Sequence, residues 1–429
     1  MAKAELKVAP SEIRLTFNED VSLAGSRIEV TGGAGAVALD GVHVAAGMPR
    51  TLVASVRGPW TAGVHTVRWQ VAGRDGHPVR GEFTFTLLPE GVPAQVPPIS
   101  PPPTPSTAPS APLAAAPEAA GVGAPGFVAI RWLTFASILV LLGAVVFSRL
   151  AETLPETAAA AALERSWQLG RGAAAAALVL SVGRLGAQVL AFGGNLADAD
   201  LARDLVGGSV WGWGWGLQFG AALMLLWTFG SGRSRKTPHH VAAIGVLGMA
   251  LTPALSGHAA TGGALAVLVD GMHVAGAGGW LGTLLLLLAA GVPATQRLPD
   301  GERDSALAAL VGRFSRVALV CAALVAVTGV LRGWQNIGSW DGLVASTYGQ
   351  ILLLKIAVLS IVGATGAWNW RVVTPRLGTP AGNAQLRRVA TVELSVAVLV
   401  VLVTAVLVAT PAPVEAPMAS ATAGLGTPR

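Results

Sequence analysis

Of the ionisable residues within the long apolar runs of this sequence, five most need an explanation. They are Arg184, Asp270, His273, Lys355 and Glu393. An ionisable side chain inside a lipid bilayer is costly and usually has a functional role, such as ion binding or proton transfer. Asp270 and His273 are three residues apart, so they would share one face of a helix. Pairing between helices is the alternative role, and it is the one we favour for Arg184, Lys355 and Glu393.

Ligands suited to a transition metal accompany these residues. His258 lies at the end of one apolar run, Met249 lies midway through that run, and Met272 is next to His273. Imidazole and thioether groups with a carboxylate, and without a thiolate, suit copper, for which affinity peaks among the first-row metals. We therefore predict His258 and His273 as metal ligands. The residues of a candidate transport path are Met249, Asp270, Met272, Lys355 and Glu393.

A second candidate metal site lies near the N-terminus. The segment Asp75-Gly76-His77-Pro78 places a carboxylate and an imidazole two residues apart in a predicted turn, where both can bind one ion. We predict Asp75 and His77 as metal ligands. The alternative is an aspartate that caps the turn beside an incidental histidine.

Several classes of protein are excluded by what the sequence lacks. Its single Cys excludes a disulfide scaffold, a CxxC redox centre and a Cys-based zinc site. It contains no Walker A motif, no G-x-S-x-G, no H-E-x-x-H and no dinucleotide-binding fingerprint, so we expect that it is not an enzyme. The 29 basic residues are scattered along the chain, many of them in membrane-flanking loops, and the net charge of +6 therefore gives no support for nucleic-acid binding.

The N-terminal part of the chain predicts a small β domain and a linker. Apolar and polar residues alternate over 12–17, 64–69 and 82–87, with Gly-rich breaks between these runs. This period is typical of half-buried strands and predicts an all-β sandwich or small barrel over residues 1–88. Residues 89–126 contain 12 of the 27 prolines, which predicts a semi-extended linker.

The remainder predicts an all-α membrane bundle. The chain of 429 residues is 52% hydrophobic and only 12% charged. Apolar runs of about 20 residues, each long enough to cross a bilayer as a helix, recur along it. We predict about eight such helices within residues 127–412, followed by a flexible tail over 413–429. The runs are 127–148, 171–193, 210–230, 240–257, 264–290, 315–334, 347–369 and 389–410.

The basic residues of the short loops predict the orientation. If residues 1–88 lie outside the cytoplasm, the loops that face inward collect most of the arginines and lysines, including Arg233, Arg235 and Lys236. Cytoplasmic loops carry this excess of positive charge. We therefore predict a multi-pass protein of the plasma (inner) membrane, with its N-terminal domain and its C-terminus extracytoplasmic.

The sequence resembles a fusion of two copper-handling families. The stretches 9–19, 62–69 and 75–85 are similar to the periplasmic copper-binding protein CopC. The later part resembles its membrane partner CopD. That similarity rests on 256–260, 273–282, 314–329, 348–355, Asn369 and Glu393.

The resemblance implies a cupredoxin-like β-sandwich that delivers copper to an eight-helix membrane unit of the copper-importer type. In CopC proteins Cu(II) is held by an N-terminal His, with its amine, and by the Asp and His of the D-x-H turn, which Asp75 and His77 match. This sequence has no N-terminal His, and Met48 alone remains of the family's Met-rich Cu(I) loop. We therefore expect a domain that is truncated at its N-terminus relative to the family.

The predicted function is membrane copper transport, with uptake as the direction that the resemblance implies and a role in copper homeostasis and resistance. The copper ion is the expected bound metal. The lipid bilayer and a periplasmic or cytoplasmic copper chaperone are the expected partners. Two alternatives stay open: a copper chaperone or sensor that does not transport, and a b-type haem electron-transfer protein with two membrane histidines as axial ligands. The different depths expected for His258 and His273 argue against haem.

Overall fold

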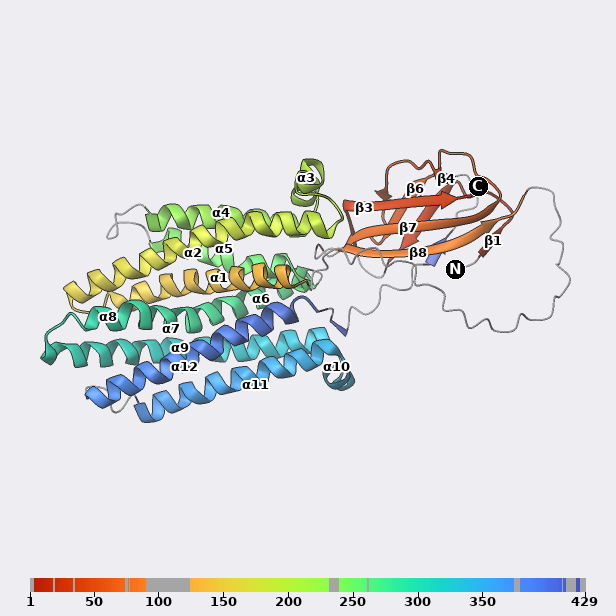
Figure 1. The fold of residues 1–429 in the computed structure, drawn as a ribbon. Helices are drawn as coiled ribbons and strands as arrows, with labels where there is room; N and C mark the ends of the chain where they lie inside the picture. The colour runs from red at the N-terminus through yellow and green to blue at the C-terminus, as the bar shows by residue number, and fades with distance from the viewer. Residues whose placement is uncertain are drawn as a thin grey trace. The chain divides into compact units, whose positions relative to one another are not determined.

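A computed structural model describes most of the chain (Figure 1). The residues that lie outside this description are 1–3, 18–19, 34, 74–75, 77, 90–123, 231–238, 261, 374–378, 411, 414–421 and 425–429, with a few further side chains, among them that of His258. The chain forms two compact units. Unit 1 comprises Met1–Gly121, Val189–Ser209 and Pro417–Arg429, and unit 2 comprises Val122–Gln188 and Val210–Ala416.

Unit 1 is built on a β-sandwich, as predicted. One sheet has the strand order β1-β8-β7-β3-β4 and the other has the order β5-β6-β2-β9. Figure 1 shows the long strands β3, β7 and β8 side by side. The strands are β1 (Ala4–Leu6), β2 (Glu12–Thr16), β3 (Val21–Gly32), β4 (Gly35–Val37), β5 (His43–Val44), β6 (Thr51–Ser55), β7 (Gly63–Gly73), β8 (Pro78–Leu87) and β9 (Thr422–Gly424).

The core of the sandwich comes from the alternating residues of these strands. Ile13, Leu15 and Phe17 are buried, and the ring of Phe17 meets Trp69 of β7 edge-on at 5.2 Å between centroids. Their polar neighbours point away from this core. The predicted 413–429 tail contains β9, which pairs antiparallel with β2; the predicted linker lies almost entirely outside the described residues.

Unit 1 also contains a segment from much later in the chain. Residues 189–209 include the last turn of α2 (Glu156–Ala191) and helix α3 (Ala199–Gly207). Phe192 is buried together with Ala24 and Ala72 of the sandwich. The side-chain amide of Gln70 donates to the Phe192 carbonyl at 3.1 Å, and Arg80 Nη2 donates to the Ala191 carbonyl at 2.7 Å.

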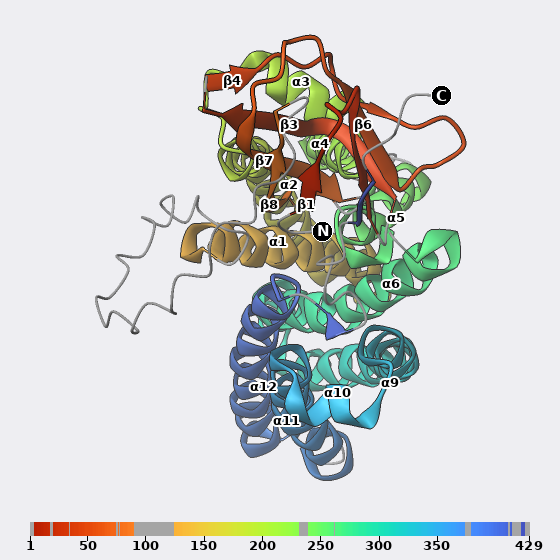
Figure 2. The same ribbon diagram turned by 90° about the vertical axis from the view of Figure 1, so that its right-hand side faces the viewer.

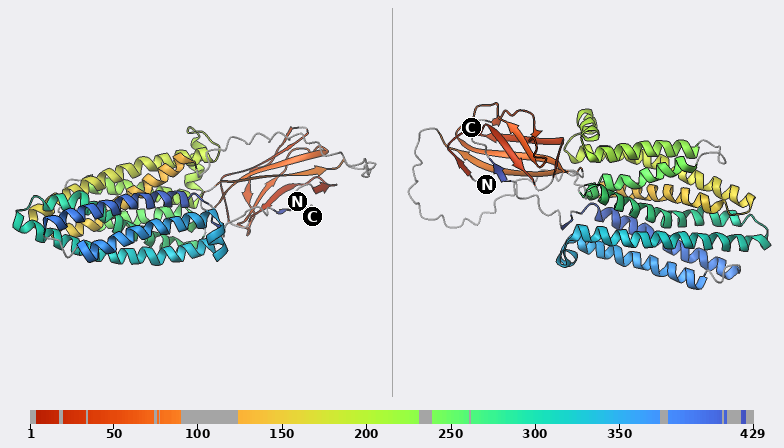
Figure 3. Two further views of the ribbon diagram at one scale, coloured as in Figure 1. Left: turned by 60° about the horizontal axis from the view of Figure 1, so that its bottom comes forward. Right: turned by 180° about the vertical axis from the view of Figure 1, so that it is seen from behind.

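Unit 2 is a bundle of helices that run side by side (Figure 3). Figure 2 looks along them and shows α9, α11 and α12 as neighbours. Besides α2, the elements are α1 (Pro125–Ala151), α4 (Val210–Gly230), α5 (His239–Leu255), η1 (His258–Ala260), α6 (Gly263–Ala277), η2 (Gly278–Gly282), α7 (Thr283–Leu286), η3 (Leu287–Gly291), α8 (Val292–Thr295), α9 (Asp300–Ile337), α10 (Trp340–Ala345), α11 (Thr347–Trp368), η4 (Asn369–Val373) and α12 (Pro380–Leu407).

The number of apolar membrane spans is lower than the eight predicted. All eight predicted runs are helical, but six helices of the described chain are long and apolar enough to cross a membrane. Helix α5 is apolar but short, with 17 residues. Helix α4, with 21 residues, is not among the six. The six spans are Pro125–Ala151, Glu156–Ala191, Gly263–Thr295, Asp300–Ile337, Thr347–Val372 and Ala384–Leu407.

The span Gly263–Thr295 packs closely on both sides through glycines. It is interrupted by two π-helical stretches, η2 and η3. A Cβ added to Gly279 would lie 2.7 Å from the Cys321 sulfur of α9, and one added to Gly282 would collide with the Leu139 carbonyl oxygen of α1. Small residues permit such close approach between membrane helices. The two glycines therefore hold this span closely against α9 on one side and α1 on the other.

Candidate metal-binding and transport site

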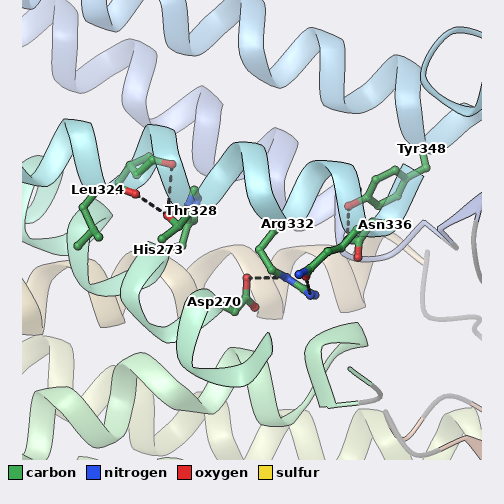
Figure 4. Close-up of polar contacts among 9 residues, drawn as sticks. Asp270, His273, Leu324, Thr328, Arg332, Asn336 and Tyr348 are labelled. Carbon is green, nitrogen blue, oxygen red and sulfur yellow. Dashed lines mark hydrogen bonds and ion pairs between the residues drawn. The ribbon is translucent and has the colours of Figure 1, made fainter. Parts of the chain in front are cut away.

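A line of polar side chains runs between α6, α9 and α11 (Figure 4). His273 and Asp270 come from α6, and Thr328, Arg332 and Asn336 come from α9, where they are spaced four residues apart on one face. Because α6 and α9 are antiparallel neighbours, His273 meets Thr328 and, one turn away, Asp270 meets Arg332.

The hydrogen bonds of Thr328 determine which nitrogen of His273 carries the proton. Thr328 Oγ1 donates to the Leu324 carbonyl at 2.6 Å, the usual bond of a threonine within a helix. We assign Nδ1 of His273, 3.0 Å away, as the donor in the bond between the two side chains, because this assignment leaves the Thr328 proton for the Leu324 carbonyl. A neutral imidazole then has its lone pair on Nε2. Metal-binding histidines typically have this arrangement, in which the second ring nitrogen donates to a fixed acceptor.

Space for the imidazole comes from the residue after Thr328. A Cβ added to Gly329 would lie 3.3 Å from Cε1 of His273, which is tighter than most such contacts. The glycine therefore lets the ring lie close to α9.

An ion pair lies one helical turn from His273. Arg332 Nε is 3.7 Å from Asp270 Oδ1, and the Arg332 side chain is only 12% exposed. Arg332 Nη1 also donates to Gln335 at 2.8 Å. Asp270 and His273 thus lie on one face of α6, and the positive charge of Arg332 on α9 lies opposite them.

The polar line ends at a contact between α9 and α11. Asn336 Nδ2 donates to the Tyr348 hydroxyl at 2.7 Å. Tyr348 is buried in a cluster with Ile337 and Leu407, where α9 and α12 end and α11 begins. This cluster identifies one end of the bundle and allows depths along different helices to be compared.

Lys355 adds a second positive charge to the site. It lies two turns after Tyr348 on α11 and interacts electrostatically with both Asp270 and His273. Two cations and one carboxylate thus surround the imidazole. Their net positive charge would oppose a metal cation at His273.

None of the other predicted ligands is found among the described side chains between α6, α9 and α11. Met249 is fully buried among Leu225, Val246 and Ala250, whereas Met272 is 43% exposed. His258 begins the turn η1 at the end of α5, and its side chain lies outside the described residues. Asp75 and His77 also lie outside them, in the connection between β7 and β8.

The two remaining ionisable residues lie elsewhere in the bundle. Arg184 links α2 to α4, because it donates to the Gln218 side chain and lies over the Trp211 ring at 5.6 Å. Glu393 of α12 is 3% exposed. Among the described residues no group of three or more His, Cys, Asp or Glu side chains is arranged to hold a metal, so a metal at His273 would have few protein ligands.

Sequence reasoning missed Thr328, Arg332, Asn336 and Tyr348 as parts of the site. The signal was present, because Thr328, Arg332 and Asn336 recur every four residues within an apolar helix. We assigned no role to this spacing.

Family comparisons cover most of the chain. Residues 1–88 match the CopC domain, residues 122–267 match the N-terminal domain of copper resistance protein D-like proteins, and residues 308–407 match copper resistance protein D. Copper resistance protein C of Escherichia coli is 34% identical over 86 residues, which are 18% of this chain and 68% of that protein. The chain belongs to the CopC–CopD copper-resistance family.

Other members of this family extend the similarity. The copper transport protein CutJ of Bacillus subtilis (strain 168) is 25% identical over 434 residues, covering 96% of this CopC–CopD chain and 73% of CutJ. The crystal structure of CopC from Methylosinus trichosporium OB3b is 29% identical and covers 22% of this chain and 90% of that one, with a TM-score of 0.20. The crystal structure of PcoC from Escherichia coli is 30% identical and covers 20% and 89%, with a TM-score of 0.19.

This CopC–CopD protein is therefore a multi-pass membrane protein of a copper resistance and transport family. The predictions of CopC and CopD parts, of a β-sandwich before a helical membrane region, and of a link to copper are confirmed at this level.

Proposed function

We propose that this protein carries copper across the plasma membrane and that His273 is an intramembrane ligand of the ion. The observation that carries this proposal is the Thr328 hydrogen bond, which leaves the His273 Nε2 lone pair available for a metal. Imidazole is a good ligand for copper. The relation to CutJ, named as a copper transport protein, supports the same cargo.

The site is suited to passing an ion rather than storing it. Arg332 and Lys355 oppose a bound cation, and Asp270 only partly offsets them. A transport site must bind strongly enough to admit an ion and weakly enough to release it. A storage or sensor protein would instead be expected to surround the metal with several anionic or soft ligands.

We further propose that the N-terminal domain captures copper outside the cell. Asp75 and His77 would bind the ion, His258 would receive it at the outer surface of the membrane, and His273 would take it into the bundle. The direction is inward, with the N-terminal domain and the C-terminus extracytoplasmic. The support for this orientation is the excess of basic residues in alternate loops.

Copper accumulation by intact cells tests this function. Cells that express the wild-type protein should take up copper faster than cells with an empty vector, and His273→Ala should remove most of the difference. His240→Ala is the matched control, because His240 is an exposed histidine at the start of α5. Equal uptake by His273→Ala and wild type, at equal membrane levels, would contradict the proposal.

The same strains separate the two alternatives. A chaperone or sensor would bind copper in the purified protein without changing cellular uptake. A b-type haem protein would show a Soret absorbance band that His273→Ala removes. Neither alternative is favoured by a particular observation among the described residues.

A further inference from the structure

Glu393 is the most deeply buried carboxyl group of the described membrane bundle. Its side chain lies in the middle of α12, thirteen residues after Pro380 and fourteen before Leu407, and is only 3% exposed. Oε1 has no hydrogen-bond partner among the described residues. A polar group in an apolar interior without a partner is destabilising, and a bare charge is far more so. The structure therefore retains a costly group whose role the His273 site does not explain.

Among the described residues, no positive side chain forms an ion pair with Glu393. The elements packed against α12 are α11, η4, α1, α7 and η3. Of these, α7 and η3 have no charged residue. The charged residues of the others and of α12 are Lys355, Arg371, Arg131, Arg149, Arg387 and Arg388. None of them forms an ion pair with Glu393 in the described structure, and Arg131 instead donates to the Ala405 carbonyl, three turns along α12.

A glycine of α11 lies beside the carboxyl group. A Cβ added to Gly366 would lie 3.8 Å from Oε1 of Glu393, so the glycine leaves open the space beside this oxygen. Asn369 is three residues further along, on the same face, and is buried. At Asn369 the α-helix changes to the π-helical turn η4, a feature that is frequent at functional sites.

Glu393 lies farther than His273 from the end of the bundle formed by Ile337, Tyr348 and Leu407. The ends of α9 and α12 meet in the cluster of Ile337, Tyr348 and Leu407. Thr328, the partner of His273, is about 14 Å from that end by the rise of a helix, and Glu393 is about 21 Å from it. An ion moving from His273 away from this end would therefore pass the depth of Glu393.

We infer that Glu393 is a cation-exchange site within the membrane, where a proton and the transported metal ion compete for one carboxylate. This inference rests on the proposed copper transport. In the metal-free protein the carboxyl group holds a proton, which supplies the missing counter-charge. When the metal binds, the O–H bond breaks, its electron pair stays on the oxygen to bind the metal, and the proton leaves to water. One proton is released for each ion bound, without any redox change.

Proton release during copper binding tests the inference. The full chain, with Asp75→Ala and His77→Ala to remove the ligands of the N-terminal domain, is titrated with Cu(I) as its acetonitrile complex and separately with Cu(II) chloride. A pH indicator in weakly buffered solution counts protons against a protein-free blank, and mass spectrometry counts bound copper. Adding Glu393→Gln should remove one bound copper and about one released proton per chain. Adding His273→Ala should remove copper without removing that proton, because a neutral imidazole has none to release from Nε2.

Equal copper binding and equal proton release with and without Glu393→Gln would overturn the inference. If Glu393→Gln does not fold, infrared difference spectra of the protein with Glu393 intact serve instead. Copper should remove the carbonyl band of a protonated carboxyl group and add carboxylate bands, and an unchanged carboxyl band would refute the site. Failure of copper uptake by wild-type cells would refute the transport proposal, whereas copper uptake without proton release would refute only the role of Glu393.

Discussion

Thr328 accepts a hydrogen bond from His273 Nδ1 while donating its own proton to the Leu324 carbonyl. This pair of bonds fixes both the orientation of the imidazole and the nitrogen on which its lone pair lies. A residue on α9 thus determines the metal-binding capacity of a residue on α6. The consequence is that Thr328 should affect copper handling although it does not bind copper itself.

Replacing Thr328 by valine should weaken copper binding about 10- to 100-fold, the usual effect of losing a partner that orients a metal ligand. Thr328→Val keeps the size of the side chain but cannot accept the proton of His273. Thr328→Ser keeps the hydroxyl group and should retain most of the affinity. Competition with a chelator of known affinity measures the difference, and equal affinities for Thr328→Val and Thr328→Ser would show that the hydrogen bond has no such role.

Lys355→Met should strengthen copper binding at His273. At an effective dielectric constant near 20, two unit positive charges about 5 to 10 Å apart repel by about 2–3 kcal/mol. Removing the charge should therefore raise the affinity about tenfold or more and slow the release of the ion. Arg165→Met is the control, because Arg165 is exposed and lies on α2, which contributes no residue to this site. Weaker binding in Lys355→Met would mean that the lysine supports the metal rather than opposing it.

The ion pair between Asp270 and Arg332 should couple α6 to α9 energetically. Asp270→Asn and Arg332→Gln each leave a charged partner in a mostly buried place, which is destabilising. The double variant should lose less stability than the sum of the two, by about 0.5–3 kcal/mol. Thermal unfolding of the wild-type protein, the two single variants and the double variant measures this coupling. Additive losses would indicate that the two side chains, 3.7 Å apart, do not interact in the membrane.

Close glycine packing predicts a sharp difference between two similar substitutions. Gly282→Ala would force a methyl group against the Leu139 backbone of α1, which cannot move aside without shifting the helix. Gly216→Ala on α4 meets nothing within 4 Å, so it should gain up to about 1 kcal/mol from helix propensity. We expect a lower unfolding temperature for Gly282→Ala and an equal or higher one for Gly216→Ala. Equal effects would contradict the packing of α1 against η2.

The periodicity of the sequence was sufficient to predict both kinds of structure. Alternation at Ile13, Leu15 and Phe17 predicted strands of the sandwich, and apolar runs predicted the helices of the bundle. All eight predicted runs are helical, and six helices of the described chain are long and apolar enough to cross a membrane; α5, with 17 residues, is shorter than these six. The apolar runs therefore predicted where the helices lie better than they predicted how many of them are long and apolar enough to cross a membrane.

The site could be predicted only in part. His273 and Asp270 stood out because ionisable residues are rare in apolar runs. Their partners could not be paired with them from sequence, because the register between α6 and α9 depends on the close contacts of Gly276 and Gly279 with Cys321. Likewise, no local pattern indicated that residues 189–209 pack on the β-sandwich through Phe192 and Gln70. Both contacts join segments that are far apart in the chain.

Copper entry into sealed vesicles that contain only the purified protein tests the central claim most directly. Wild-type protein should move copper from outside to inside at a rate proportional to the amount of protein, and His273→Ala should reduce this rate to nearly that of empty vesicles. His240→Ala should transport as the wild type does. Entry at the same rate with His273→Ala, or no entry with wild-type protein that has bound copper, would contradict a copper path through His273.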